Sequence, residues 1–320
     1  MNYTNTSKIP LAVAVFLATD DYDYEPNTVS ATSLLKPVRQ FVLSKRVEKG
    51  DMQVDIGSMV SSRMGSAIHS AIEKAWTNPE KALKALGYPD KVAKNVVINP
   101  TEVKPGQIPV YMEQRAYKDI QGFRVSGKFD FVAEGKVQDF KSTSVYTYLN
   151  QTNKEKYILQ GSIYRWLNQD IITRDVMDIH YFFTDWNKKD SMSNKDYPPN
   201  RVFTQTLKLM SIQETEKWVS NKLSVIKRNL DIEEALLPLC TDAELWRKET
   251  VYKYYKNPAN TTRSTKNYSN MIDAMNHYVN DGRIGLVQEV KGQVAACKYC
   301  NAFPLCSQKD KLIESGDLVL

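Results

Sequence analysis

Two aspartates and a lysine near the middle of the chain have the types and spacing needed for phosphodiester chemistry. Asp130 is followed, after eight intervening residues, by Asp139 and Lys141. Alternate side chains of a β-strand point to the same face, so Asp139 and Lys141 are predicted to share one. Mg²⁺ prefers carboxylate oxygens, and a bound divalent ion can activate water beside a phosphate. The lysine could orient that water, although solvated strand residues would give the same short pattern.

A hairpin is predicted to bring the two aspartates together. Apolar and polar residues alternate from Phe123 to Phe131, which indicates a strand with Asp130 on its polar face. The link from Ala133 to Lys136 contains a glycine and suits a tight turn. The strand after this turn would carry Asp139.

Two polar residues follow on a predicted helix at 154–167. Gln160 and Tyr164 are one turn apart, so they share a face of that helix. Directed into a metal cleft, they could hold the phosphate or base of a bound strand. A pair at the edge of the core is the alternative.

A histidine and a further acid precede the hairpin. His69 lies on a predicted helix at 63–76, one turn after Gly65, and a glycine there would let the helix approach the sheet closely. Imidazole suits Mn²⁺ better than Mg²⁺, although a lone histidine on such a helix is also explained by packing. Glu113, on a predicted strand at 110–117, is the further acid, and Glu102 in a proline-flanked loop is a weaker competitor.

The four cysteines form a second constellation. Cys297, Cys300 and Cys306 have C-x2-C-x5-C spacing, and Cys240 lies upstream. Four thiolates can hold a [4Fe–4S] cluster or Zn²⁺. Zinc sites usually come as two close pairs, which this spacing is not, and disulfides would be unusual in a cytosolic chain. We predict a structural site in which Cys240 and the three C-terminal cysteines tie about the last quarter of the chain into a closed loop.

Composition and the remaining elements set the frame for these sites. The chain has 320 residues, of which 42% are hydrophobic and 25% charged, with a net charge of +6. These values are ordinary for a globular protein and suit an anionic partner. The early apolar run at 11–18 is too short to span a bilayer and lacks the features of a signal peptide, so we expect a cytoplasmic protein. Helices are predicted at 9–17, 30–46 and from the Ser211–Glu214 capping box onward, strands at 123–133, 137–142, 179–185 and 202–207, and a mobile loop at 187–200.

Taken in order, these residues resemble the RecB-like branch of the PD-(D/E)xK nucleases. Within that branch the chain is most similar to the iron–sulfur members, which include the AddB nuclease domain, the CRISPR adaptation nucleases and phage exonucleases. The family pattern of G-x3-H, an acid, G-x-x-D, D-x-K and Q-x3-Y is matched by Gly65–His69, Glu113, Gly127–Asp130, Asp139–Lys141 and Gln160–Tyr164. Its cluster ligands are matched by Cys240, Cys297, Cys300 and Cys306. Phe129, rather than proline, precedes Asp130.

The resemblance implies an α/β fold of the restriction-endonuclease type, with a mixed sheet flanked by helices. It implies an N-terminal helical region (1–105) that contributes His69, a nuclease core (106–230) and a C-terminal iron–sulfur region (231–320), all in one compact unit.

The implied activity is metal-dependent exonuclease cleavage of DNA, of the phage type, in recombination, repair or degradation. His69, Asp130, Asp139 and the backbone carbonyl of Phe140 would bind Mg²⁺ or Mn²⁺, with Glu113 helping. Lys141 would assist the attacking water, and Gln160 and Tyr164 would position DNA. A single-strand-binding or recombination protein could be a partner, in the host cytoplasm if the chain is phage-encoded. The alternative is a DNA-binding or complex-assembly subunit without cleavage activity. Polarity, strand preference and oligomeric state stay open.

Overall fold

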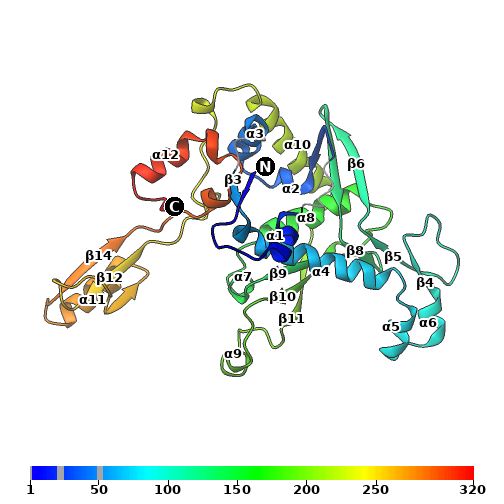
Figure 1. The fold of residues 1–320 in the computed structure, drawn as a ribbon, viewed down its shortest axis with the longest axis horizontal. Helices are drawn as coiled ribbons and strands as arrows, with labels where there is room; N and C mark the ends of the chain where they lie inside the picture. Colours follow the sequence, from blue (N-terminus) through cyan, green and yellow to red (C-terminus); the bar gives the residue numbers. More distant parts are fainter. Residues whose placement is uncertain (1, 20–24, 49–52) are drawn as a thin grey trace. The chain divides into compact units, whose positions relative to one another are not determined.

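The computed structural model describes residues 2–19, 25–48 and 53–320 (Figure 1). The chain forms two compact units, Met1–Lys36 with Gln53–Lys227, and Pro37–Met52 with Arg228–Leu320. It therefore passes from one unit to the other three times. This partition differs from the three consecutive segments predicted from the sequence, because residues 37–52 group with the C-terminal region.

A mixed sheet forms the centre of the first unit. Its strand order is β11-β10-β9-β8-β5-β4. The pairs β9–β10 and β4–β5 are parallel, whereas β10–β11, β8–β9 and β5–β8 are antiparallel. The strand bounds are β4 (Val96–Ile98), β5 (Ile108–Met112), β8 (Phe131–Ala133), β9 (Lys136–Thr143), β10 (Val176–Phe183) and β11 (Val202–Lys208). The predicted strands at 137–142, 179–185 and 202–207 are thus confirmed.

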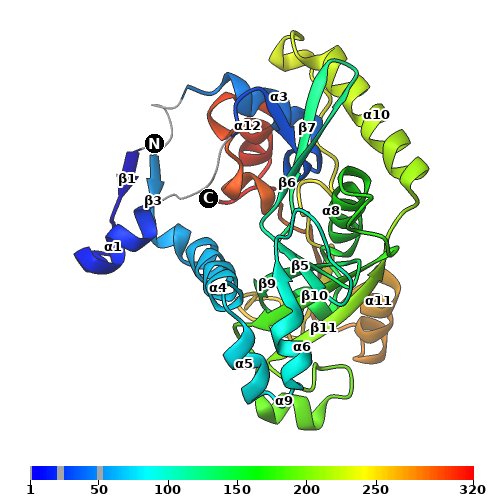
Figure 2. The same ribbon diagram turned by 90° about the vertical axis from the view of Figure 1, so that its right-hand side faces the viewer.

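Helices cover both faces of this sheet (Figure 2). On one face α4 (Val60–Trp76) packs against β9, and the rings of His69 and Phe140 lie 5.8 Å apart. On the other face α8 (Lys154–Leu167) carries Gln160, whose amide contacts the carboxylate of Asp139. Neighbouring strand residues point to opposite faces, so the two helices lie on opposite sides of β9. The predicted α/β fold, a mixed sheet flanked by helices, is confirmed.

The two long strands predicted before the hairpin are each broken in the structure. After β5 the chain enters β6 (Arg115–Ile120), and β7 (Phe123–Lys128) precedes β8. The strands β6 and β7 belong to a second sheet of order β2-β7-β6, with β2 at Thr28–Ser30. Glu113 and Asp130 lie at the two breaks, where the Glu113 amide donates to the Asp130 carbonyl at 3.2 Å. The prediction of two continuous strands was wrong because alternation does not reveal a bend, here with Glu113 at φ 51°.

The hairpin between the aspartates is confirmed. Antiparallel pairing joins Ala133 to Lys136 across a two-residue loop. Glu134 has φ 53° and Gly135 has φ 71°, and two successive positive φ angles are typical of the tight turn that matches strand twist. Ser126 alternates with Asp130 on the face predicted to be polar, yet it is fully buried, so the prediction was wrong at that position.

Other parts of the first unit support the sheet. The capping box is confirmed, since Ser211 accepts from the Glu214 amide at 3.2 Å and Glu214 accepts from the Ser211 amide at 2.8 Å. The helix predicted at 30–46 is instead two helices, because Pro37 interrupts it. The remaining elements are β1 (Asn2–Thr4), α1 (Leu11–Ala18), α2 (Ala31–Leu34), β3 (Gln53–Asp55), α5 (Glu80–Ala85), α6 (Asp90–Asn95), α7 (Val145–Leu149), α9 (Lys188–Ser193) and α10 (Ile212–Asn229).

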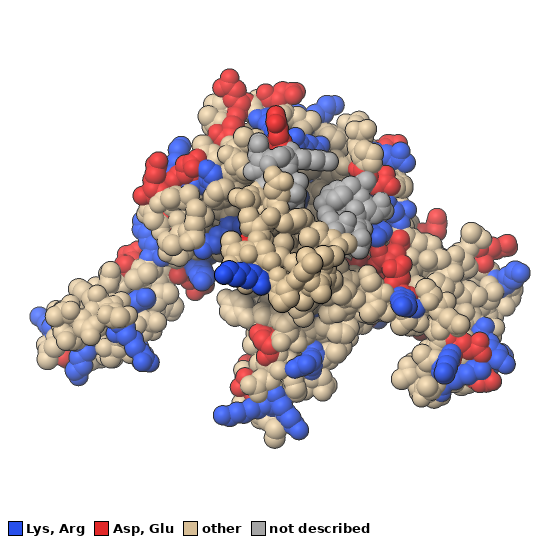
Figure 3. Space-filling model, viewed as in Figure 1, with Lys and Arg blue, Asp and Glu red and all other residues tan. Residues whose placement is uncertain are grey.

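A short helix stands in the segment predicted to be a mobile loop. The Asn187 side chain caps α9 by accepting from the Lys189 amide at 2.8 Å. This helix buries none of its side chains, so no apolar periodicity marked it in the sequence. Basic side chains gather over its tip (Figure 3).

The second unit gathers the cysteines around a small apolar cluster. Leu245, Val294, Cys297, Leu312 and Leu318 form this cluster, and Cys240 packs against it. A separate sheet has the order β13-β12-β14 and packs against α11. The elements are α3 (Val38–Arg46), β12 (Val251–Tyr255), β13 (Lys266–Tyr268), α11 (Met271–Asn280), β14 (Leu286–Val290) and α12 (Ser307–Glu314), with 3₁₀ helices η2 (Glu234–Leu236), η3 (Ala296–Tyr299) and η4 (Phe303–Leu305).

In the described part of the chain, every helix is too short or too polar to cross a bilayer.

Candidate active site and cysteine pocket

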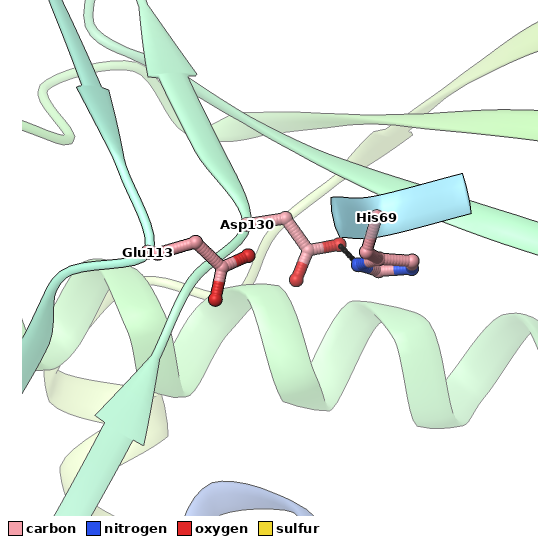
Figure 4. Close-up of side chains that lie close together, drawn as sticks. All are labelled: His69, Glu113 and Asp130. Carbon is pink, nitrogen blue, oxygen red and sulfur yellow. Dashed lines mark ion pairs between the residues drawn. The ribbon is translucent and has the colours of Figure 1, made fainter. Parts of the chain in front are cut away.

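Three side chains with metal-ligating atoms converge in the first unit (Figure 4). One donor atom each from His69, Glu113 and Asp130 lies within 4.8 Å of the others. Among residues 2–19, 25–48 and 53–320, this is the one group of histidine, cysteine and acidic side chains that meets so closely. His69 comes from α4, whereas both acids come from the strand breaks, where the backbone can direct them out of the sheets. Their exposed fractions of 29%, 23% and 15% make the group partly buried, with Asp130 the least exposed of the three.

The backbone of Phe140 joins this group. Its amide donates to Asp130 Oδ2 at 3.1 Å, and its carbonyl oxygen lies 2.8 Å from His69 Nε2. His69 Nδ1 lies 3.3 Å from Asp130 Oδ2. The carbonyl predicted as a metal ligand therefore lies beside the predicted histidine ligand.

Asp139 and Lys141 lie on one face of β9, as their spacing predicts. Asp139 is 1% exposed, and its Oδ2 forms an ion pair with the ammonium of Lys141. Its Oδ1 accepts from Gln160 Nε2 at 3.1 Å, and the same nitrogen donates to the Tyr164 hydroxyl at 2.8 Å. Both helix residues are buried. Gln160 and Tyr164 thus fix the Asp139 carboxylate, and their predicted contact with DNA stays a prediction.

The charges around the site favour a bound cation. Loss of solvation and the Asp139 carboxylate raise the pKa of Asp130 well above its usual value, against the opposing effect of Lys141. Burial lowers the pKa of Lys141, but Asp139 and Asp130 outweigh it, so this pKa is raised. Glu113 further raises the pKa of Asp130. A divalent ion at the group of three would relieve this repulsion between carboxylates.

Two residues of the site were not singled out in the sequence. Lys128 forms an ion pair of 2.7 Å with Glu113, and the ring of Tyr157 lies 5.6 Å from the Lys141 ammonium. Lys128 stands on the polar side of the predicted strand, and Tyr157 lies one turn before Gln160, so spacing could have identified both. Glu102, the weaker competitor, is exposed and lies outside the group of three.

Of the two glycines near the site, Gly127 permits a close approach between elements, whereas Gly65, for which this was predicted, does not. A Cβ atom at Gly127 would lie 2.8 Å from Leu167 Cδ1 and 3.0 Å from Tyr164 Cδ1, so this glycine lets α8 approach β7. A Cβ atom at Gly65 would meet nothing within 4 Å. The prediction that Gly65 permits close approach of its helix was wrong.

Gly65→Ala is therefore expected to stabilise the protein. Glycine inside a helix costs about 0.5–1 kcal/mol relative to alanine, and the added methyl group has free space. Urea unfolding should show a higher free energy of unfolding by that amount. Gly127→Ala is the matched comparison and should lower it, because its methyl group meets a rigid ring. A destabilised Gly65→Ala variant would contradict the placement of α4.

The four cysteines line a pocket of about 40 Å³ in the second unit. All four are free thiols, so no disulfide joins these residues, each of which the structure describes. Burial, followed by the Glu244 carboxylate, raises the pKa of Cys240 to about 12, and burial raises that of Cys297. Gln308 holds the Cys240 backbone, accepting from its amide at 2.8 Å and donating to its carbonyl at 2.9 Å. Buried thiols of high pKa need a positive group to hold them as thiolates.

The spacing of the sulfur atoms bears on what such a group could be. No three of the four cysteines, all within the described residues, have their Sγ atoms within 4.8 Å of one another. Tetrahedral zinc with bonds of about 2.3 Å would place its sulfur ligands about 3.8 Å apart. Every set of three therefore includes at least one pair of sulfur atoms farther apart than this.

Comparisons with known proteins give only distant similarities. No family model and no curated protein matches the sequence. The solved structure of SSO0001 is similar with a TM-score of 0.42 and 12% identity, over 68% of this chain and 87% of that one. A putative exonuclease from Eubacterium rectale has a TM-score of 0.39 and 12% identity, over 70% and 95%. An alkaline exonuclease from Laribacter hongkongensis has a TM-score of 0.33 and 9% identity, over 64% and 90%. TM-scores this low do not establish a shared fold.

Proposed function

We propose that this protein is a metal-dependent DNA exonuclease. The observation that carries the proposal is the convergence of His69, Glu113 and Asp130 within 4.8 Å, close to the ion pair of Asp139 and Lys141. The alternative is that these acids are ordinary solvent-exposed strand residues. That alternative does not explain why two acids from separate strand breaks and a histidine from a helix converge on one point. A site of this composition suits Mg²⁺ or Mn²⁺.

Each residue has a role in this proposal. His69, Asp130, Asp139 and the Phe140 carbonyl would hold the metal, with Glu113 binding directly or through water. The bound ion would supply an activated water and offset charge on the phosphate. Lys141 would orient the water, and Gln160 and Tyr164 would keep the Asp139 carboxylate in place and position the DNA.

Phosphate contacts would extend to basic segments. Lys188 and Lys189 stand at α9, whose tip carries a group of basic side chains (Figure 3). DNA binding that depends on such phosphate contacts weakens as the salt concentration rises. An enzyme of this kind, of the phage type, would act in DNA recombination, repair or degradation, with a single-strand-binding or recombination protein as partner.

An assay on end-labelled single- and double-stranded DNA tests the proposal. We expect hydrolysis with Mg²⁺ or Mn²⁺ and none with a chelator, and the labelled products report polarity and strand preference. Absence of hydrolysis with both metals on both substrates would overturn the proposal. DNA binding without cleavage would favour the alternative of a binding or assembly subunit.

The histidine in the group gives a prediction about metal preference. His69→Ala should weaken Mn²⁺ binding about tenfold or more, and Mg²⁺ binding less, because imidazole is the better ligand for Mn²⁺. Calorimetric titration of each metal into the DNA-free protein measures both. His277→Asn is the control, since His277 belongs to the second unit, packs against Tyr254 and Tyr268, and lies outside the group of three. Equal Mn²⁺ affinity in His69→Ala and the wild type would exclude His69 as a ligand.

We also infer that the cysteine pocket holds a [4Fe–4S] cluster through Cys240, Cys297, Cys300 and Cys306. Support comes from the shared pocket and from the C-x2-C-x5-C spacing with one distant cysteine, which lacks the two close pairs usual for zinc. Anaerobic purification should yield a brown protein with iron and acid-labile sulfide. A colourless protein with stoichiometric zinc would favour Zn²⁺ instead.

A further inference from the structure

A buried arginine faces the cysteine pocket from a distant part of the sequence. Arg39, on α3, is 2% exposed and donates from Nε to Cys306 Sγ at 3.3 Å. Its Nη1 donates to the carbonyls of Glu234 at 3.2 Å and Leu237 at 3.0 Å. Its Nη2 donates to Ser307 Oγ at 3.2 Å and pairs with the Glu234 carboxylate. The guanidinium group is thus held rigidly against one cysteine.

The contact with sulfur is the informative one. Arginine stays charged at any accessible pH, so its burial is costly unless every donor meets a good acceptor. Glu234 supplies one negative charge and also accepts from the Ser307 amide at 2.9 Å. A neutral thiol is a weak acceptor, whereas a sulfur atom with negative charge forms a stronger hydrogen bond. The Nε–H of Arg39 therefore fits Cys306 as an anionic ligand.

Charge balance points the same way. Four thiolates around a [4Fe–4S] core with two positive charges leave two negative charges, in a pocket whose cysteines are buried or partly buried. Among the residues described as lining that pocket, Arg39 is the one cation and Glu244 the one anion, so Arg39 is the lining group whose charge can offset that of the cluster. Hydrogen bonds to ligand sulfurs and net charge set the reduction potential of such clusters.

We propose that Arg39 is a positioning residue that holds Cys306 as an anionic ligand and offsets the negative charge of the cysteine-bound cluster. The inference rests on the proposed cluster. Removing Arg39 should destabilise the reduced, more negative cluster more than the oxidised one. It should also loosen Cys306, so that iron is lost more readily.

Arg39→Gln and Arg46→Gln form the test pair. Arg46 lies on the same helix and donates to the carbonyls of Leu230 and Ile232, both at 2.7 Å, without a described contact to sulfur. In anaerobically purified full-length protein, iron release to a chelator is followed by visible absorbance, and the reduction potential by redox titration. We expect Arg39→Gln to release iron about tenfold faster or more and to have a more negative potential, with Arg46→Gln unchanged.

A further variant guards against misfolding. Arg39→Gln leaves Glu234 without its cation, whereas Arg39→Gln/Glu234→Gln removes both charges together. The double variant should still have a more negative potential than the wild type, through loss of the hydrogen bond to Cys306, with a smaller shift than Arg39→Gln. If either folded variant releases iron at the wild-type rate and has the wild-type reduction potential, the proposed role of Arg39 is overturned. Wild-type protein without iron would overturn the proposed cluster, and this inference with it.

Discussion

Lys141→Met should lower DNA hydrolysis by roughly 10²–10⁴-fold, the range typical of a group that assists proton transfer. Methionine keeps most of the side-chain stem but removes the ammonium that pairs with Asp139. Single-turnover hydrolysis at saturating metal measures the loss, and circular dichroism checks the fold. Lys136→Met is the matched control, because Lys136 lies on the same strand and pairs with Asp178 instead. Comparable activity in the two variants would exclude Lys141 from the reaction.

The pH dependence of the wild type and of Lys141→Met should differ in a defined direction. The pKa of Asp130 is raised, so a proton competes with the metal for this carboxylate as pH falls. Activity should therefore decline on the acid side at a higher pH than an ordinary carboxyl group would cause. Lys141 opposes that shift, so its loss should move the acid limb to still higher pH. An acid limb that moves to lower pH would contradict the assignment.

Gly292→Ala should destabilise the second unit by about 3 kcal/mol or more, at the upper end of the cost of overpacking. A Cβ atom at this position would lie 1.5 Å from the Lys248 carbonyl oxygen and 2.3 Å from its carbon. These are backbone atoms, held by the bond of 3.0 Å from the Lys248 amide to the Gln293 carbonyl. They cannot move aside as a flexible side chain would.

The damage should reach the cysteines. The segment after Gly292 leads into Val294 and Cys297, which pack with Leu245 in the apolar cluster. Urea unfolding and thiol labelling by a maleimide should show an earlier midpoint and faster modification than in the wild type. Lys291→Ala, one residue earlier, is the control and should leave both unchanged. An unaltered midpoint in Gly292→Ala would show that the two backbone segments lie farther apart.

Strong local patterns predicted the elements that carry the site. The helix at 154–167 matches α8 in full, and strand alternation placed Asp139 and Lys141 on one face. The hairpin between the aspartates followed from one turn glycine. These features are determined by residues close to one another in the sequence, and the periodicity of apolar and polar residues is therefore enough to predict them.

Features that depend on distant contacts could not be predicted. The strand break at Glu113 needs a positive φ in a residue other than glycine, for which the sequence has no marker. The burial of Gln160 and Tyr164 depends on how closely α8 approaches β7 over Gly127. The contact of Arg39 with Cys306 joins residues 267 positions apart. The local sequence around either residue does not indicate a contact with a residue so far away in the chain.

The passage of the chain between its two units sets an order of events during synthesis. Ribosomes add about 5–20 residues per second, so the 267 positions between Arg39 and Cys306 correspond to roughly 13–50 s. Through that interval Arg39 lacks Cys306, and Leu43 lacks the C-terminal cysteines with which it lines the pocket. The residues from His69 to Tyr164 are all available much sooner. The cysteine pocket is consequently among the last parts of the chain that can assemble.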